Sequence, residues 1–146
     1  MKKFLTVILW FSCLPFMYAD SQGMQNTEIA GVKSGELREA VASWWGFNSG
    51  DATECLQKAI DSGVKKLIVD NTGREWLVGP IRLRSGQEIV FADGVVVRAL
   101  PGAFKKQGES LFTAKDVSGV TLRGGKNAVL MMNKKDYQDT ARYQWS

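Results

Sequence analysis

Apolar and polar residues change their period near residue 63, which divides the chain into a helical part and a part rich in short strands. Between residues 51 and 63 the apolar positions recur at i, i+3, i+4, i+7 and i+8, as on one stripe of a helix. They are Ala52, Cys55, Leu56, Ala59 and Ile60. Asp51 and Glu54 have the spacing of a capping box, and Gly63 stands where a left-handed residue often ends a helix. The pattern predicts a helix over residues 51–63.

A second, weaker stripe lies upstream, in the segment of residues 20–50. Its members have a similar spacing and are Leu37, Ala40, Val41, Trp44 and Trp45. They predict a weak helix in this segment. In the stronger helix Cys55 lies inside the apolar stripe, so a buried core thiol is favoured over a nucleophile or a metal ligand.

Beyond Gly63 the apolar runs are short and rich in β-branched or aliphatic residues, with Gly, Asp, Asn and Ser between them. They include "KLIVD", "WLVGPIRLR", "EIVF", "GVVVRA", "SLFTA", "GVTLRG" and "AVLMM". Two strand–turn–strand units repeat. Residues 89–91 match 120–122 at an offset of 31, and residues 95–97 match 128–130 at an offset of 33. Such spacing predicts stacked three-strand units, as in a solenoid, and leaves a β-sandwich as the alternative.

A helix placed directly before a run of strands has a physical explanation. The first unit of a stack exposes an apolar end and unpaired strand edges, which invite aggregation. One amphipathic helix laid across that end would cover both. We therefore expect residues 51–63 to act as a capping helix.

The first 19 residues have the pattern of a secretory signal peptide. Lys2 and Lys3 precede an apolar run over residues 4–14 that is too short to span a bilayer, and cleavage is expected after Ala19. A lipoprotein anchored at Cys13 is the alternative. Either reading predicts a secreted or periplasmic protein, and no other apolar run is long enough for a membrane span.

Charge and composition exclude several kinds of chemistry. The chain carries 19 basic and 15 acidic residues, and removal of residues 1–19 leaves 17 against 15, a net charge of +2. This balance, without basic clusters among aromatics, argues against nucleic acid as a partner. Histidine is absent, which removes the commonest general base and most zinc sites. After cleavage Cys55 is the one remaining cysteine, so an intrachain disulfide is impossible.

Residues 44–137 resemble a known family. "DATECLQKAIDSG" leading into "KLIVDNTGREWLVGPIRLRSGQEIVFADGVVV" is similar to the N-terminal cap and first coils of bacterial proteins of the pectate lyase superfamily, also called pectin lyase-like. "WWGFN" and "LFTAKDVSGVTLRG" resemble exported members of that group. The resemblance implies an all-β fold, a right-handed parallel β-helix with an N-terminal α-helical cap. Residues 64–146 would then be its first coils.

The resemblance also sets expectations about chemistry. Members of this superfamily have many coils, whereas this chain ends at residue 146 after about three, so we expect the N-terminal part of a longer protein. Catalytic residues in the family lie on middle coils, and we therefore expect them beyond residue 146. No metal site is predicted in this fragment, although the family makes calcium possible in the full-length protein.

Four arginines are the candidate binding residues, because each follows or flanks an inward aliphatic residue. They are Arg82, Arg84, Arg98 and Arg123. Stacked on one face, they would bind the carboxylate of an acidic sugar through paired hydrogen bonds. A solvated face without a ligand is the simpler interpretation. Trp44, Trp45 and Trp76 are candidates for stacking on sugar rings, although packing in the core is favoured.

The resemblance implies two possible functions. The first is an exported carbohydrate-active enzyme, a polysaccharide lyase or glycoside hydrolase, acting on a plant or algal polysaccharide. The second is a non-catalytic protein that binds glycan or builds the cell surface. An independent small globular domain is a third possibility. The family includes catalytic and non-catalytic members, so the resemblance alone does not choose between them.

Overall fold

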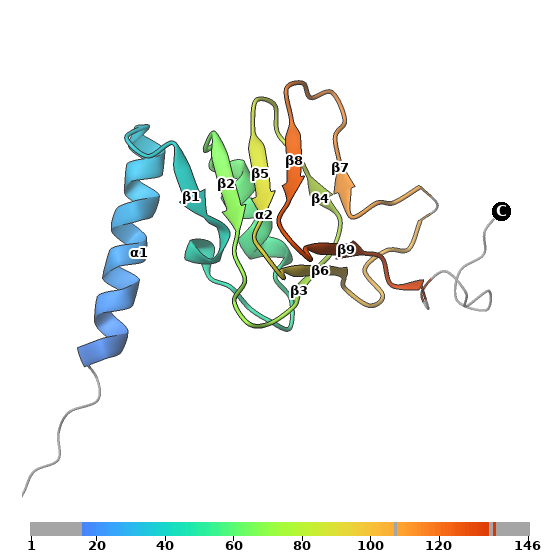
Figure 1. The fold of residues 1–146 in the computed structure, drawn as a ribbon, viewed down its shortest axis with the longest axis horizontal. Helices are drawn as coiled ribbons and strands as arrows, with labels where there is room; N and C mark the ends of the chain where they lie inside the picture. Colours follow the sequence, from blue (N-terminus) through green and yellow to red (C-terminus); the bar gives the residue numbers. More distant parts are fainter. Residues whose placement is uncertain (1–15, 107, 135, 137–146) are drawn as a thin grey trace, which may run out of the picture.

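The computed structural model describes residues 16–106, 108–134 and 136, which form two α-helices and nine short strands (Figure 1). The elements are, in order, α1 (Phe16–Ser34), β1 (Glu39–Val41), the 3-10 helix η1 (Ala42–Trp45), α2 (Thr53–Asp61), β2 (Lys66–Val69), β3 (Trp76–Val78), β4 (Ile81–Arg82), β5 (Glu88–Phe91), β6 (Val96–Ala99), β7 (Phe112–Thr113), β8 (Thr121–Gly124) and β9 (Val129–Met131).

The strands form three parallel sheets. Their orders are β1-β2-β5-β8, β3-β6-β9 and β4-β7. Beginning with β2, successive strands join the first, second and third sheet in turn, so neighbours within a sheet are far apart in the sequence. Ile89 pairs with Leu122, and Val96 pairs with Val129. Both pairs have an offset of 33. This confirms the offset predicted for residues 95–97, whereas the offset predicted for residues 89–91, which was 31, is two residues too short.

The prediction of an all-β right-handed parallel β-helix was wrong. The described residues form a mixed α/β arrangement, with two α-helices beside separate parallel sheets of four, three and two strands. No closed or solenoid sheet joins these strands in the described part of the chain. Residues 64–134 therefore form separate parallel sheets rather than coils of a β-helix. The period of the apolar residues did not predict the fold class correctly, because strands of two to four residues carry too few residues to specify which distant strand they pair with.

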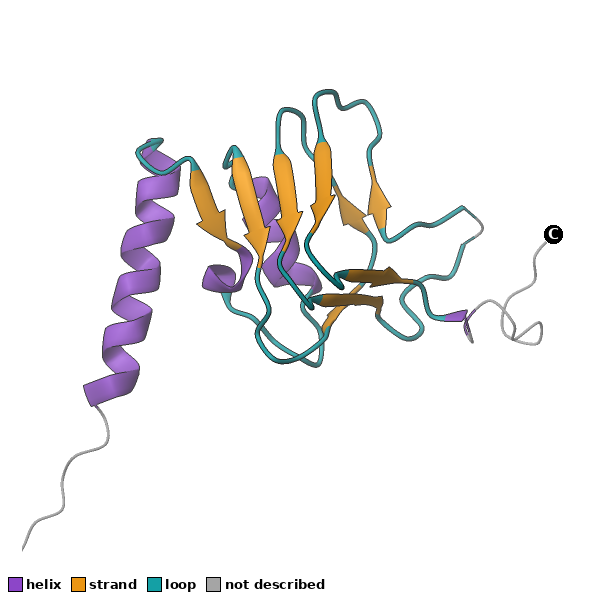
Figure 2. Ribbon diagram, viewed as in Figure 1, coloured by secondary structure: helices purple, strands orange, loops and turns teal. Residues whose placement is uncertain are grey.

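The upstream apolar stripe does not form one α-helix. Ala40 and Val41 belong to β1, which pairs with β2 through Ala40 and Leu67, and the two tryptophans are the last two residues of the 3-10 helix η1. Pairing with β2 buries Ala40 completely and overrides the helical spacing. The helix in this segment is α1, which lies beside β1 (Figure 2).

α2 confirms the helix predicted from the strong stripe, over the slightly shorter range Thr53–Asp61. All five stripe residues are buried, and Gly63 has a φ of 73° as expected for a left-handed residue. The cap differs in detail, because Ala52 is the N-cap. Asp51 lies one residue earlier and accepts the backbone N–H of Thr53 at 2.9 Å. Glu54 pairs with Lys58 rather than completing a capping box.

α2 also covers the outer edges of β3 and β4. The Thr53 hydroxyl accepts the backbone N–H of Gly79 at 2.7 Å. The Gln57 amide accepts the N–H of Arg82 at 3.0 Å and donates to the Arg82 carbonyl at 3.1 Å. The helix therefore supplies the hydrogen bonds that a further strand would have made, and protects these two edges from pairing with another chain.

Cys55 is buried between α2 and η1, where its thiol donates to the Ala42 carbonyl across 3.3 Å. Burial raises the pKa of the Cys55 thiol from its usual 9.0 to about 12; the negative charge of Asp70 adds to the rise and Lys58 opposes it. The thiolate is the reactive form of cysteine. Cys55 is thus an inert core thiol, as predicted.

We expect Cys55 to resist alkylation in the folded protein. In a Cys13→Ser variant at pH 9, the folded thiol stays protonated and shielded, whereas about half of the thiol groups ionise once the chain unfolds. Labelling with iodoacetamide, followed by mass spectrometry, should therefore be at least a hundredfold slower without denaturant than with it. Equal rates in the two conditions would contradict the burial of Cys55.

The predicted signal peptide lies in residues 1–15, outside the described residues, and in the first four residues of α1. Cys13, the alternative lipid anchor, also lies outside them. Cleavage after Ala19 and export therefore stay predictions. No helix among the described residues is long and apolar enough to cross a membrane.

Candidate functional site: a basic cleft at the β4–β7 sheet

A cleft of about 380 Å³ lies where the end of α2 meets the two-stranded β4–β7 sheet. Its lining consists of Asp61, Arg82, Leu83, Arg84, Thr113 and Lys115. Two guanidinium groups and one ammonium group oppose one carboxylate, so the lining has a formal net charge of +2. A concave surface with this balance favours an anionic ligand.

Successive side chains of β4 and of the residues after it point alternately into the core and toward the surface, and this places the two arginines on the cleft. Ile81 and Leu83 point inward and are buried, so Arg82 and Arg84 point outward. The backbone is held on both sides: Leu83 donates its N–H to the Thr113 carbonyl at 2.9 Å, and Gln57 of α2 bonds to Arg82. The two guanidinium groups thus project from a segment whose backbone is hydrogen-bonded on both sides.

Arg84 and Arg82 differ in how much of their hydrogen-bonding capacity is free. The Arg84 guanidinium donates to the Asp61 carbonyl at 2.5 Å, where a cation is stabilised by the negative end of the α2 dipole. Neither Arg82 nor Lys115 forms a salt bridge with any residue that the structure describes. Arg82 and Lys115 are therefore the cations most available to a ligand.

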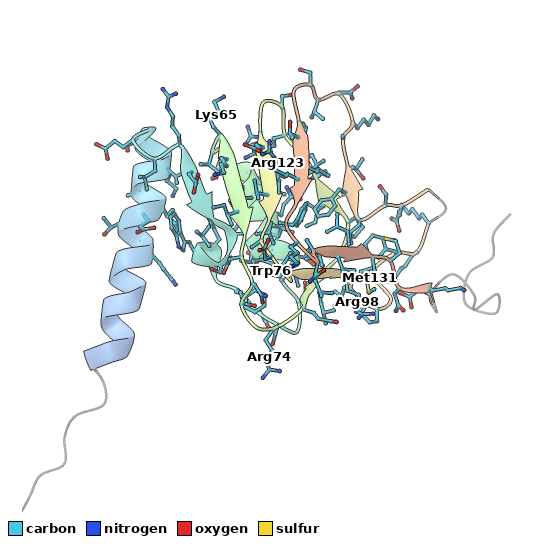
Figure 3. The ribbon with its side chains drawn as sticks, viewed as in Figure 1. Lys65, Arg74, Trp76, Arg98, Arg123 and Met131 are labelled. Carbon is cyan, nitrogen blue, oxygen red and sulfur yellow. The ribbon has the colours of Figure 1, made fainter. Side chains whose placement is uncertain are left out.

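The structure separates the four arginines predicted from sequence. Arg82 and Arg84 lie together in the cleft. Arg98 lies on β6 and Arg123 on β8, each in another sheet, and Figure 3 shows these two arginines far apart. Arg98 makes two hydrogen bonds of 2.8 Å to Glu75, which lower the pKa of the Glu75 carboxyl and raise the pKa of Arg98. The described residues thus show no single face on which all four arginines are stacked.

Arg123 is paired as well. Its guanidinium lies 3.0 Å from the Glu88 carboxylate, on the solvent side of the four-stranded sheet. Arg98 and Arg123 therefore each have an acidic partner already. This agrees with the simpler interpretation of these two residues as part of a solvated surface.

The three candidate tryptophans pack against other residues rather than being free to stack on a sugar ring. Trp76 is fully buried, with its ring 4.7 Å from that of Phe47 and its indole N–H donated to the Asp70 carbonyl at 2.9 Å. Trp44 and Trp45 stack on each other and pack partly buried against the core. Packing, the favoured alternative, is confirmed for Trp76.

Sequence reasoning missed Asp61, Thr113 and Lys115, although a signal for two of them was present. Ile81 pairs with Phe112 and Arg82 pairs with Thr113, an offset of 31. Extending this register by two residues places Lys115 beside Arg84. Comparing the run that ends at Arg84 with the one that ends at Lys115 would have identified the basic side of the cleft. Asp61 lies at the end of α2 and is brought there by helix packing.

The cleft has the groups needed to bind an anion but a limited set for catalysis. Asp61 is the one carboxylate in its lining, whereas glycosidic hydrolysis uses two carboxylates across a groove. No group of three or more potential metal ligands occurs among the described residues. The expectation that catalytic residues lie beyond residue 146 stays a prediction, as does calcium in a longer protein.

Comparisons of the chain with protein-family models, with curated proteins and with solved structures found no match. The resemblance of residues 44–137 to the pectate lyase superfamily therefore stays a prediction from the residues quoted above. The function proposed below depends on the chemistry of the cleft.

Proposed function

We propose that this chain is the glycan-binding part of an exported carbohydrate-active protein, and that its basic cleft binds an acidic polysaccharide. The observation that supports the proposal is the pair of unbridged cations, Arg82 and Lys115, which line the same cleft as Thr113. A uronate offers a carboxylate for these cations. Its ring hydroxyls offer hydrogen bonds to Thr113.

Binding is favoured over catalysis by this part of the chain because Asp61 is the single carboxylate in the cleft. A carboxylate pair or a metal-assisted lyase centre would have to be supplied by residues outside the cleft. Cleavage of the polysaccharide would therefore depend on residues outside this cleft. Structural glycan binding at the cell surface needs no further residues.

The proposal predicts that removing either unbridged cation weakens binding of an acidic glycan. Arg82→Gln and Lys115→Gln should each raise the dissociation constant for oligogalacturonate roughly fivefold, since an exposed ion pair contributes about 1 kcal/mol. The double variant should bind more weakly than either. Isothermal titration calorimetry at low ionic strength measures the effect, which should shrink as salt is added.

Arg98→Gln is the matched control, because Arg98 is also an exposed arginine on a strand but is bonded to Glu75 in another sheet. It should leave oligogalacturonate binding unchanged. A neutral β-glucan oligosaccharide should bind at least tenfold more weakly than oligogalacturonate. Equal binding of the neutral glycan, or equal weakening by Arg98→Gln, would refute the proposal.

A further inference from the structure

The basic cleft contains one acidic group, and this group is not neutralised. Asp61 forms no salt bridge with any residue that the structure describes, although three cations line the same cleft. The nearest of them, Arg84, bonds to the backbone carbonyl of Asp61 and not to its carboxylate. Opposite charges in one cleft thus stay apart, which leaves the Asp61 carboxylate free to act on a ligand.

The Asp61 carboxylate is held in place by Gln57. The side-chain nitrogen of Gln57 donates to this carboxylate at 3.2 Å and to the Arg82 carbonyl at 3.1 Å. The side-chain oxygen of Gln57 accepts the Arg82 N–H, so the amide is bonded to β4 through both of its polar atoms. The carboxylate therefore has a defined place beside the backbone of β4.

The acidic group and the free ammonium group lie at opposite edges of β4. α2 bonds to one edge through Gln57, and β7 pairs with the other. Asp61 belongs to α2, whereas Lys115 belongs to the segment after β7. The cleft therefore has an acidic side and a basic side, with Arg82 and Arg84 between them.

The negative charge of Asp61 does not stabilise α2. Asp61 is the last residue of this helix, where the helix dipole favours a cation and disfavours an anion. The hydrogen bond from Gln57 does not require the charge either, because the amide oxygen of an asparagine would also accept it. A role toward a ligand would account for a charge that the local structure does not use.

We propose that Asp61 determines the specificity of the cleft, by accepting hydroxyl groups of the bound sugar and excluding a second anionic group from the α2 side. This inference rests on the proposed function. An ionised carboxylate only accepts hydrogen bonds, so it binds hydroxyl groups and repels sulfate or phosphate esters. The ligand is then a polyuronate whose ring hydroxyls are free, and not a sulfated or phosphorylated glycan.

A matched pair of ligands tests this inference on the full chain by isothermal titration calorimetry. The pair is hexagalacturonate and the same oligosaccharide with its hydroxyl groups O-sulfated. Attraction to the net positive charge alone would make the sulfated form bind more tightly. We expect the opposite, with the sulfated form binding at least roughly threefold more weakly, because its sulfates meet the Asp61 carboxylate.

Asp61→Asn should reverse this preference. It keeps the acceptor for Gln57 and removes the repulsion, so the sulfated form should bind about tenfold more tightly than it binds to the unaltered chain. The variant should also raise the midpoint of urea denaturation, because it removes a negative charge from the end of α2. A lower midpoint would mean that the charge stabilises the fold, and would overturn its assignment to a ligand.

Glu36→Gln is the matched control, because it removes one negative charge from an exposed position between α1 and β1, outside the cleft lining. It should leave the preference for the unsulfated form unchanged. Tighter binding of the sulfated form by the unaltered chain would overturn the role of Asp61 but leave acidic-glycan binding intact. Equal effects of Glu36→Gln and Asp61→Asn would do the same. If the unaltered chain binds neither oligosaccharide, the proposed function itself is wrong, and this inference with it.

Discussion

Replacing Ile60 by aspartate is expected to unfold this protein. Ile60 is fully buried on α2, within the apolar cluster that joins the helix to the sheets. Loss of a buried isoleucine side chain costs about 2–5 kcal/mol. A carboxylate without a partner at the same place adds a desolvation cost of several kcal/mol. The sum is comparable with the whole stability of a domain, about 5–15 kcal/mol.

Circular dichroism during urea denaturation measures the effect, with two variants that separate its causes. Ile60→Val keeps the site apolar and should cost only about 1 kcal/mol. Lys58→Asp introduces the same carboxylate on an exposed position of the same helix, and should cost about 1 kcal/mol through the lost Glu54 pair and the helix dipole. If Ile60→Asp were no worse than Lys58→Asp, the burial of the α2 stripe would be incorrect.

The elements that sequence predicted well are those whose pattern is local. The α2 stripe, the left-handed Gly63 and the buried Cys55 all depend on residues within one helix, where a period of 3.6 has few alternatives. The strand containing Ile89 was likewise correct as an element. The upstream stripe failed because β1 gains its hydrogen bonds from β2, about 27 residues away, and such pairing is invisible in a local period.

The predictions of the fold class and of the strand register of residues 89–91 were wrong for a related reason. In β8 all four residues are exposed, so the burial pattern that fixes register in β5 is absent there. Matching residues 120–122 to 89–91 aligned apolar letters, whereas the actual pairing aligns Leu122 with Ile89 and Gly124 with Phe91. We therefore expect the contacts between the turns, rather than the apolar residues, to hold this register.

The candidate site was predicted in part. Alternation around Leu83 correctly set Arg82 and Arg84 on the outside, because that inference needs only period two. Grouping them with Arg98 and Arg123 required knowing which sheet each strand joins. Glu75 and Glu88, which neutralise the two distant arginines, come from segments 23 and 35 residues away from their partners and leave no trace in the local sequence.

Replacing Gly125 by alanine is expected to destabilise the folded protein strongly, although less than Ile60→Asp. A Cβ at this position would lie 2.9 Å from both the Asp93 backbone nitrogen and the Phe91 carbonyl oxygen, and would also meet the Asp93 carboxylate. Two of these three neighbours are backbone atoms that cannot move aside as a flexible side chain does. The Phe91 carbonyl also accepts the N–H of Gly125 itself at 2.7 Å, so the two turns have to separate.

Separation of the turns would break more than one hydrogen bond. The Lys126 N–H donates to the Asp93 carboxylate at 2.8 Å, and the Gly94 N–H donates to the Lys126 carbonyl at 2.8 Å. Steric overlap and the weakening of these bonds should together cost about 3 kcal/mol. Because the contacts join the segments after β5 and β8, amide hydrogen exchange in β8 should accelerate along with the loss of stability.

Gly124→Ala is the control for this prediction, since it adds the same methyl group one residue earlier. Its Cβ would meet only the Ala128 side chain, at an ordinary contact distance of 3.7 Å. The change in the free energy of unfolding should stay within about 0.5 kcal/mol. Equal losses in the two variants would mean that the flexibility of the glycine pair, rather than close contact with Phe91 and Asp93, governs this turn. A large loss confined to Gly125→Ala would show that backbone contact between the turns fixes the β5–β8 register, which the apolar residues of β8 leave undetermined.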